Sequence, residues 1–313
     1  MLLFRGCLAA LLLGLLGCEK AEEPLLYQAT GEYAASPKVI FDTDTANEID
    51  DLYAMARLFP DTSIEVLGIN SAQWFHHYSG DSSVYASQRL NEELLEIAGL
   101  LDWPHPLGSD SIMGDPWGGF TPRPNPASQF IIDQVKALPE GEKLVVMSIG
   151  ALTNLAIAIR MDTTIAPQIV SYSLGLQYYP ERGGYWSKSD FNVRRDLNAT
   201  NYCLNRPDLE MHVLPVNVAR EYQWPREDVF ERLTSCGDMG DYLRQKWLER
   251  FGDFDTWIMW DVALLQAFLH PEMATEEIID GPVDNPPRRL YVYTDIDYDA
   301  MYADYWSTVS TAY

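Results

Sequence analysis

Five carboxylates crowd into one short stretch near the start of the chain. Asp42, Asp44, Glu48, Asp50 and Asp51 fall within ten consecutive residues. Carboxylates this close repel one another, which raises their pKa values unless a cation or strong hydrogen-bond donors lie between them. A hard divalent cation relieves the repulsion most simply, and Ca²⁺ suits a mixture of carboxylate, carbonyl and water ligands. The stretch is therefore a candidate metal site.

The residues on either side predict the elements that position these acids. Val39–Phe41 is a short apolar run typical of a strand, and the amphipathic series Ile49–Ala56 that follows has helical spacing. The acids thus occupy a strand-to-helix turn, and open α/β sheets place their ligand sites where strands end. A purely structural interpretation stays open, in which Asp50 and Asp51 complement the helix dipole and the earlier acids cap turns.

The rest of the chain alternates predicted strands with predicted helices. These are strand 63–70, helix 84–98, helix 128–138, strand 143–148, helix 151–160, strand 169–174, helix 196–205, strand 211–216, helix 257–269, strand 289–294 and helix 297–307. The alternation predicts an α/β fold. Segments 102–127 and 175–190 are predicted to be loops because the first is rich in Pro and Gly and the second in polar and aromatic residues.

Further polar residues follow other predicted strands and loops. Thr153 and Asn154 come soon after a predicted strand, Asp190 and Asn192 end a long loop, and Asp261 lies in the first turn of a predicted helix. Each has an ordinary structural interpretation, since Thr, Asn and Asp cap helices and acids favour first helical turns. Taken one at a time, these residues do not choose between capping and ligand binding.

Taken in order, the motifs resemble the inosine-uridine preferring nucleoside hydrolase family, in a divergent branch of it. The family's Asp-x-Asp, short turn and Asp-Asp match Asp42–Asp51 here, with a longer turn. Its Gly-Leu-Thr-Asn, Glu-Phe-Asn and His-Asp motifs are similar to Gly150–Asn154, Asp190–Asn192 and Trp260–Asp261. The resemblance implies a nucleoside-hydrolase-like α/β fold, with a mostly parallel central sheet flanked by helices and the site at the strand C-terminal ends.

The resemblance also assigns a metal and a base. It implies that Asp44, Asp51, Asp261 and the backbone carbonyl of Thr153 bind Ca²⁺. It further implies that Asp50 takes a proton from a water molecule held by the ion as that water attacks the sugar.

The same resemblance points to the substrate contacts. Asp190 and Asn192 match residues that hold sugar hydroxyls, while Asn47 in the acidic turn and His76 after the second predicted strand are additional candidate contacts. Trp260 stands where the family has a histidine that protonates the departing purine. Because an indole can stack on a base but cannot transfer a proton, we expect slow or absent hydrolysis of inosine.

These assignments predict a Ca²⁺-dependent glycosidase that hydrolyses the N-glycosidic bond of a ribonucleoside or a related small-molecule glycoside. One alternative is a catalytically silent, surface-tethered protein that binds a nucleoside or carbohydrate through the same contacts. A more remote alternative is a haloacid-dehalogenase-like phosphatase, because Val39–Thr45 also fits the first motif of that family. That family does not explain the Asp50–Asp51 pair.

The first residues have the pattern of an export signal. Arg5 precedes the apolar run Leu8–Leu16, which is too short to span a bilayer, and Gly17-Cys18 resembles a bacterial lipobox. We therefore predict a signal peptide over residues 1–17, lipid modification of Cys18, a flexible tether over 18–36 and a catalytic domain over 37–313. The predicted location is the cell envelope, on a bacterial membrane.

The net charge limits the binding partners that we expect, and the cysteine content limits the possible disulfides. With 46 acidic and 22 basic residues, the net charge of −24 argues against nucleic-acid binding and against direct contact with an anionic membrane, leaving only the lipid anchor. Beyond the signal, Cys203 and Cys236 remain, and both a disulfide and two buried thiols stay open. The family resemblance is also consistent with a homo-oligomer.

Overall fold

The computed structural model describes residues 36–77, 79, 83–114 and 123–313. The predicted signal peptide, Cys18 and the tether up to residue 35 lie outside these residues, so the predictions made for them stay predictions. Within the described residues, no helix is both long and apolar enough to cross a membrane.

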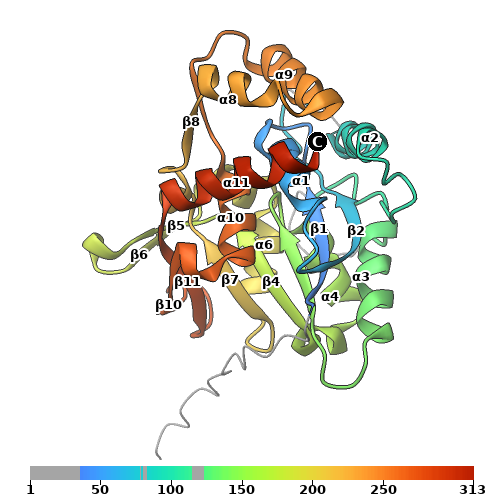
Figure 1. The fold of residues 1–313 in the computed structure, drawn as a ribbon. Helices are drawn as coiled ribbons and strands as arrows, with labels where there is room; N and C mark the ends of the chain where they lie inside the picture. The colour runs from blue at the N-terminus through green and yellow to red at the C-terminus, as the bar shows by residue number, and fades with distance from the viewer. Residues whose placement is uncertain (1–35, 78, 80–82, 115–122) are drawn as a thin grey trace, which may run out of the picture.

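A seven-stranded sheet forms the centre of the molecule (Figure 1). In order across the sheet, its strands are β10 (Ala274–Asp280), β11 (Arg289–Ile296), β7 (Glu210–Leu214), β4 (Ile169–Leu174), β3 (Leu144–Ser148), β1 (Lys38–Thr43) and β2 (Glu65–Ser71). All neighbouring pairs are parallel except β10 with β11, so the predicted mostly parallel sheet is confirmed. The carboxyl ends of the parallel strands consequently meet at one edge.

Helices cover both faces of the sheet (Figure 1). The α-helices are α1 (Asp50–Leu58), α2 (Ser83–Ile97), α3 (Pro126–Ala137), α4 (Thr153–Met161), α5 (Phe191–Arg195), α6 (Leu197–Leu204), α7 (Val216–Ala219), α8 (Arg226–Leu233), α9 (Gly237–Phe251), α10 (Trp260–Leu269) and α11 (Tyr298–Ala312). Two small two-stranded sheets stand apart from the central sheet: the hairpin of β5 (Gln177–Tyr179) with β6 (Tyr185–Ser187), and β8 (Gln223–Pro225) paired with β9 (Thr256–Ile258) across α8 and α9. Short 3₁₀ turns occupy Thr163–Gln168, Pro180–Arg182 and Pro271–Met273.

Successive residues of the strands feed two separate hydrophobic clusters. In β1, Val39 and Phe41 pack with α1, α10 and α11 on one face, whereas Ile40 packs with α3, α4 and α6 on the other. This is the period-2 alternation that a strand buried on both sides must have. Each fully buried side chain of this size contributes about 1.5–3 kcal/mol, so the strands that carry the site are firmly held.

Helix α1 is buried along its whole length. All nine of its residues are buried, because α1 packs against α9, α10 and α11 while the sheet covers its other side. The first turn of α1 carries Asp50 and Asp51, so the packing of the apolar residues forces these carboxylates out of water as well.

Some predicted elements differ from the structure. The helix predicted from residue 257 begins at Trp260, because Thr256–Ile258 pairs with β8 as a strand. The predicted loop at 175–190 contains the hairpin β5–β6. No element is predicted from the sequence for α8, α9 or β10. Strand β10 is an edge strand with mostly exposed residues, so it lacks the apolar pattern on which such predictions depend.

The two remaining cysteines are free buried thiols. Cys203 lies in the cluster that packs under α4 and α6, while Cys236 lies in the cluster on the opposite face of the sheet. Because the sheet separates them, the disulfide alternative is ruled out for this structure.

Candidate active site

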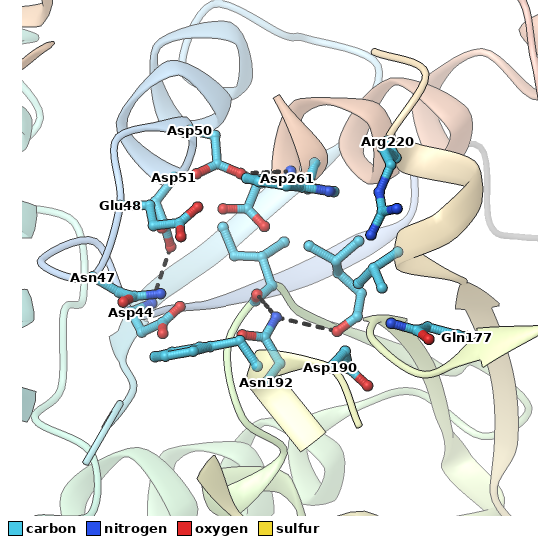
Figure 2. Close-up of a pocket in the computed structure, with 15 residues that line it drawn as sticks. Asp44, Asn47, Glu48, Asp50, Asp51, Gln177, Asp190, Asn192, Arg220 and Asp261 are labelled. Atoms are coloured by element: carbon cyan, nitrogen blue, oxygen red, sulfur yellow. Dashed lines mark hydrogen bonds between the residues drawn. The ribbon is translucent and has the colours of Figure 1, made fainter. Parts of the chain in front are cut away.

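A pocket of about 200 Å³ lies at the edge where the parallel strands end (Figure 2). Its wall includes the last residue of β4, Leu174, and residues just after three other strands, namely Asp44 after β1, Ile149 after β3 and Val216 after β7. The other lining residues are Asn47, Glu48, Asp50, Asp51, Gln177, Asp190, Phe191, Asn192, Arg220, Trp260 and Asp261. The pocket therefore sits where the topology of an open α/β sheet favours a ligand site.

Three carboxylates from two helices converge in this pocket. Oxygens of Asp50, Asp51 and Asp261 all lie within 4.8 Å of one another, and all three residues are buried. The backbone N–H of Asp261 donates to Asp50 Oδ2 at 3.1 Å, which joins the first turns of α1 and α10. Both helices present their positive ends to the acids, which offsets part of the repulsion between the carboxylates.

The end of β1 holds one of these acids in place. Thr43 Oγ1 donates to Asp51 Oδ1 at 2.5 Å, and the backbone N–H of Asp44 donates to the same oxygen at 3.1 Å. The first donor is the last residue of β1 and the second is the residue that follows it. The local motif thus orients Asp51 before any distant residue is involved.

Asp44 reaches the pocket beside a glycine that makes room for it. A Cβ atom at Gly150 would lie 2.7 Å from Asp44 Oδ1, so a larger residue there would displace the carboxylate. Asp44 Oδ2 is buried and has no hydrogen-bond partner among the described residues. A buried carboxylate oxygen without a donor is costly, which indicates that a ligand completes its surroundings.

Burial and mutual repulsion raise the pKa values of the whole cluster. The pKa values of Asp44, Asp50 and Asp261 lie well above the usual range, first because of burial and then because of neighbouring carboxylates. Burial raises the pKa of Asp51 to about 6, and burial together with the charge of Asp51 raises that of Glu48 to about 7. The cluster cannot be fully ionised at neutral pH without a cation.

The donor set fits a hard cation. The groups that converge are carboxylate oxygens, and no His or Cys lies among the described residues that line the pocket. Oxygen ligands suit Ca²⁺, whereas zinc sites are usually built with nitrogen and sulfur. The chemistry of the site and the unpartnered oxygen of Asp44 therefore fit a hard divalent cation.

Thr153 does not reach this pocket. It opens α4 fully buried, where its hydroxyl donates to Asp196 Oδ2 at 2.9 Å and accepts from Gln73 Nε2 at 3.0 Å. At the end of β3 it is Ile149 that lines the pocket, and its carbonyl accepts from Asn192 Nδ2 at 2.6 Å. The position of Thr153 gives no support to the prediction that its carbonyl binds the metal, and the strand end presents Ile149 instead.

The predicted sugar contacts line the pocket and also shape it. Asp190 caps α5 by accepting from the Val193 N–H at 3.1 Å, and it accepts from the Leu176 N–H at 2.7 Å. Burial raises the pKa of Asp190 to about 6. Asn192 also donates to the Leu174 carbonyl at 3.2 Å. Asp190 therefore caps a helix, and both residues also line the pocket, where the predicted contact with a sugar stays a prediction.

The three other predicted contacts have different positions. Asn47 and Trp260 both line the pocket, and the Trp260 ring packs 6.0 Å from the Trp257 ring. His76 is not among the lining residues; its ring lies 6.2 Å from that of Phe191, which does line the pocket. The structure thus places His76 beside Phe191 and outside the set of residues that line the pocket.

Sequence reasoning missed Arg220, Gln177 and Phe191. Gln177 belongs to β5 and Arg220 directly follows α7, so each comes shortly after a strand of the sheet ends. That position was the available signal, because the segments after parallel strands meet at one edge. Neither Gln177 nor Arg220 belongs to a recognisable motif.

The chain is similar in sequence to known proteins. The model of the inosine-uridine preferring nucleoside hydrolase family matches residues 39–303. A probable uridine nucleosidase 2 of Oryza sativa subsp. japonica is 23% identical over 265 residues, covering 76% of this chain and 75% of the relative. Uridine nucleosidase 1 of Arabidopsis thaliana is 26% identical over 219 residues, covering 64% and 62%.

Solved structures share the fold. A plant nucleoside hydrolase superposes with a TM-score of 0.67 at 18% identity, covering 88% of this chain and 99% of the other. An inosine-guanosine nucleoside hydrolase gives 0.66 at 16% identity, with coverage of 88% and 98%. At this level of identity the likeness concerns the fold.

Proposed function

Because the chain belongs to the inosine-uridine preferring nucleoside hydrolase family and is a hydrolase acting on N-glycosyl compounds, we propose that it is a Ca²⁺-dependent glycosidase that cleaves a ribonucleoside or related glycoside. The observation that carries the proposal is the buried triad of Asp50, Asp51 and Asp261 in a pocket at the strand ends. One family model accounts for residues 39–303, so the phosphatase alternative is dropped.

Four oxygen donors would hold the ion. They are the carboxylates of Asp44, Asp51 and Asp261 and the carbonyl of Ile149, all of which belong to residues lining the pocket. The buried, unpartnered Oδ2 of Asp44 supports this assignment. When bound, Ca²⁺ would supply a Lewis acid that holds neighbouring sugar hydroxyls and lowers the pKa of a water molecule.

Asp50 would act as the general base. Its carboxylate is oriented by the backbone N–H of Asp261 and lies in the pocket among groups that a cation would neutralise. Once neighbouring charges are balanced, Asp50 can ionise and accept a proton from the attacking water. A positioned base of this kind contributes about 10²–10⁴-fold to turnover.

Asp190 and Asn192 would orient the sugar from a different part of the wall. Two backbone N–H groups fix the Asp190 carboxylate, and two backbone carbonyls fix the Asn192 amide. Fixed acceptors near the anomeric carbon favour the positive charge that develops there in the transition state. Rigid positioning matters here because reorientation during the reaction would cost energy.

The leaving group would depart without help from a histidine. Trp260 lines the pocket and offers a flat ring for stacking but no transferable proton. We therefore expect pyrimidine nucleosides to be better substrates than inosine. The names of the plant relatives, uridine nucleosidases, agree with this preference.

Sugar release from uridine and inosine tests the proposal, measured in Ca²⁺, after chelation with EGTA, and after Ca²⁺ is restored. We expect uridine cleavage that chelation abolishes and Ca²⁺ restores, with slower cleavage of inosine. Release that persists after exhaustive chelation would contradict metal dependence. Binding of uridine without any release would favour the silent binding protein instead.

A further inference from the structure

One cation in the pocket has no role in the chemistry proposed above. Arg220 is the one Lys or Arg residue among the described residues that line the pocket. The acids that share the wall are Asp44, Glu48, Asp50, Asp51, Asp190 and Asp261. Figure 2 shows the Arg220 guanidinium turned toward the pocket, across from Glu48 and Asp51.

Arg220 forms no ion pair with a described residue, whereas other arginines of the chain are paired. Arg57 forms ion pairs with Asp61 at 2.8 Å and Asp304 at 3.0 Å. Arg250 donates to the Asn47 carbonyl, and its charge partly offsets the rise in the pKa of Glu48 that burial and Asp51 cause. The guanidinium of Arg220, by contrast, forms no hydrogen bond or ion pair with any residue that the structure describes.

The segment that carries Arg220 is held in a defined position. Asn217 in α7 accepts from the Tyr178 N–H at 2.9 Å and donates to the Tyr178 carbonyl at 2.8 Å. The Val216 N–H donates to the Leu176 carbonyl at 3.0 Å. Helix α7 is therefore fixed against the start of the β5–β6 hairpin.

The same contacts connect Arg220 to the predicted sugar-binding wall. Leu176 has a φ of +62°, a strained value for a bulky side chain, and its N–H donates to Asp190 Oδ2 at 2.7 Å. Gln177, the next residue, also lines the pocket. The backbone that carries Arg220, Gln177 and Asp190 is thus held in place, and a cation and an amide on it line the pocket.

Resting on the proposed function, we propose that the substrate carries an anionic group, a phosphate or a carboxylate, that Arg220 binds while the acidic end of the pocket holds the sugar. A guanidinium matches such oxyanions with two parallel hydrogen bonds. In a chain with a net charge of −24, an anion is otherwise repelled, so a local cation is needed to admit it. Arg220 is an exposed residue, and a neutral nucleoside would leave its guanidinium with water as its only partner.

The anion can sit at either end of a nucleoside, and two probes distinguish the positions. Uridine 5′-monophosphate carries a phosphate on the sugar, orotidine carries a carboxylate on the base, and uridine is the neutral reference. We expect kcat/KM for one of the anionic compounds to exceed that for uridine. In the Arg220→Gln chain this ratio should fall by about 10- to 100-fold, as expected for a hydrogen bond to a charged group.

Two further variants separate charge from geometry. Arg220→Lys keeps the charge but loses the two-pronged donor, so it should recover only part of the ratio. Arg289→Gln makes the same charge change at an exposed arginine outside the pocket and should leave the ratio unchanged.

Calorimetric binding in Ca²⁺ to the Asp50→Asn chain keeps this inference distinct from the proposed function. Suppose that the unaltered protein hydrolyses none of the three compounds, while the Asp50→Asn chain binds an anionic one through Arg220. The inference then stands and the glycosidase proposal fails. If kcat/KM for uridine equals or exceeds that for both anionic compounds, the inference is overturned while the glycosidase proposal remains. The same holds if Arg220→Gln lowers kcat/KM equally for all three compounds. Failure of both anionic compounds to bind or react also overturns it.

Discussion

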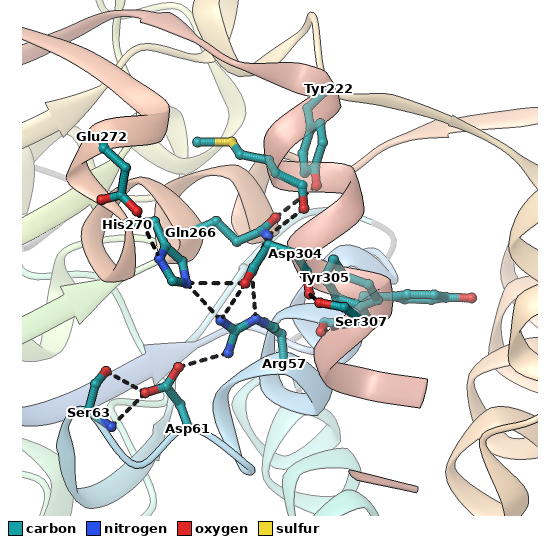
Figure 3. Close-up of polar contacts among 12 residues, drawn as sticks. Arg57, Asp61, Ser63, Tyr222, Gln266, His270, Glu272, Asp304, Tyr305 and Ser307 are labelled. Carbon is teal, nitrogen blue, oxygen red and sulfur yellow. Dashed lines mark hydrogen bonds and ion pairs between the residues drawn. The ribbon is translucent and has the colours of Figure 1, made fainter. Parts of the chain in front are cut away.

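Helices α1 and α10 pack side by side, and buried charges are balanced at the C-terminal ends of the two helices but not at their N-terminal ends. At their N-terminal ends, Asp50, Asp51 and Asp261 converge with no cation between them among the described residues. Beyond the N-terminal turns, Arg57 near the end of α1 meets Asp304 of α11 at 3.0 Å and His270 Nε2, just after α10, at 3.1 Å (Figure 3).

The two ends differ in how many of their charged groups have a hydrogen-bond or ion-pair partner. Asp304 Oδ2 also accepts from Gln266 Nε2 at 2.8 Å, and Asp61 pairs with Arg57, so the C-terminal cluster has a partner for each charge. The N-terminal cluster keeps the unpartnered Oδ2 of Asp44 and carboxylates with raised pKa values. One end stabilises the fold by itself, whereas the other requires a ligand, which is typical of functional sites.

The largest expected effect comes from breaking the acidic end. The Asp50→Asn substitution should lower kcat about 10²–10⁴-fold, because the positioned base is lost. The melting temperature should stay the same or rise, since the change removes one repelling charge. Turnover and thermal unfolding, measured on the same preparation, test both parts. Retained turnover would rule out Asp50 as the base.

Breaking the paired end should affect stability in the opposite way. Arg57→Met should cost about 3–5 kcal/mol of unfolding free energy, because Asp304 loses the cation that pairs with it at a largely buried site. Arg232→Met is the matched control, since Arg232 pairs with Asp228 at an exposed position and should cost about 0–1 kcal/mol. Urea unfolding gives both values. Equal losses would show that the Arg57 cluster is not a special support.

A smaller effect should appear in the pH dependence of stability. The folded pKa values of Asp51, about 6, and Glu48, about 7, lie above those of the unfolded chain, so the folded state holds protons that the unfolded state releases. Without metal, stability should therefore fall as pH rises from about 4 to about 7, by on the order of 3 kcal/mol for each of the two groups.

Calcium should reduce this decline. Ionised carboxylates bind the cation, and Ca²⁺ at about 100 times its dissociation constant should add about 2.7 kcal/mol. Melting temperatures at about pH 5 and about pH 7.5, in EGTA and in Ca²⁺, measure the effect. A metal-free protein whose stability instead increases over this range would show that the acidic cluster is already neutralised.

Much of the site could be predicted from local sequence. Asp44, Asp50 and Asp51 lie in one strand-to-helix turn, so their proximity depends only on a few backbone angles. Asn154 shows the limit of motif reasoning, because it donates to Asp42 Oδ1 at 2.8 Å and to the Ser71 carbonyl at 3.0 Å. That part of the Thr-Asn motif joins strand ends to one another and does not line the pocket.

Other residues could not be placed from their neighbours in sequence. Ile149 and Thr153 are four positions apart, and only the point where β3 ends and α4 begins decides which one lines the pocket. Arg220 belongs to no motif, and its side chain faces the site because α7 is hydrogen-bonded to β5. The position of His76 beside Phe191 likewise depends on how two segments far apart in the sequence pack together.

The sequence by itself determined the apolar strands, the amphipathic spacing of α1 and the turn that gathers the first acids. Those features follow from side-chain periodicity and backbone preferences that act over a few residues. Only the tertiary structure decided that Asp261, 211 positions after Asp50, donates to it. That contact depends on α10 packing beside α1, which the order of the strands and the shape of the shared core impose.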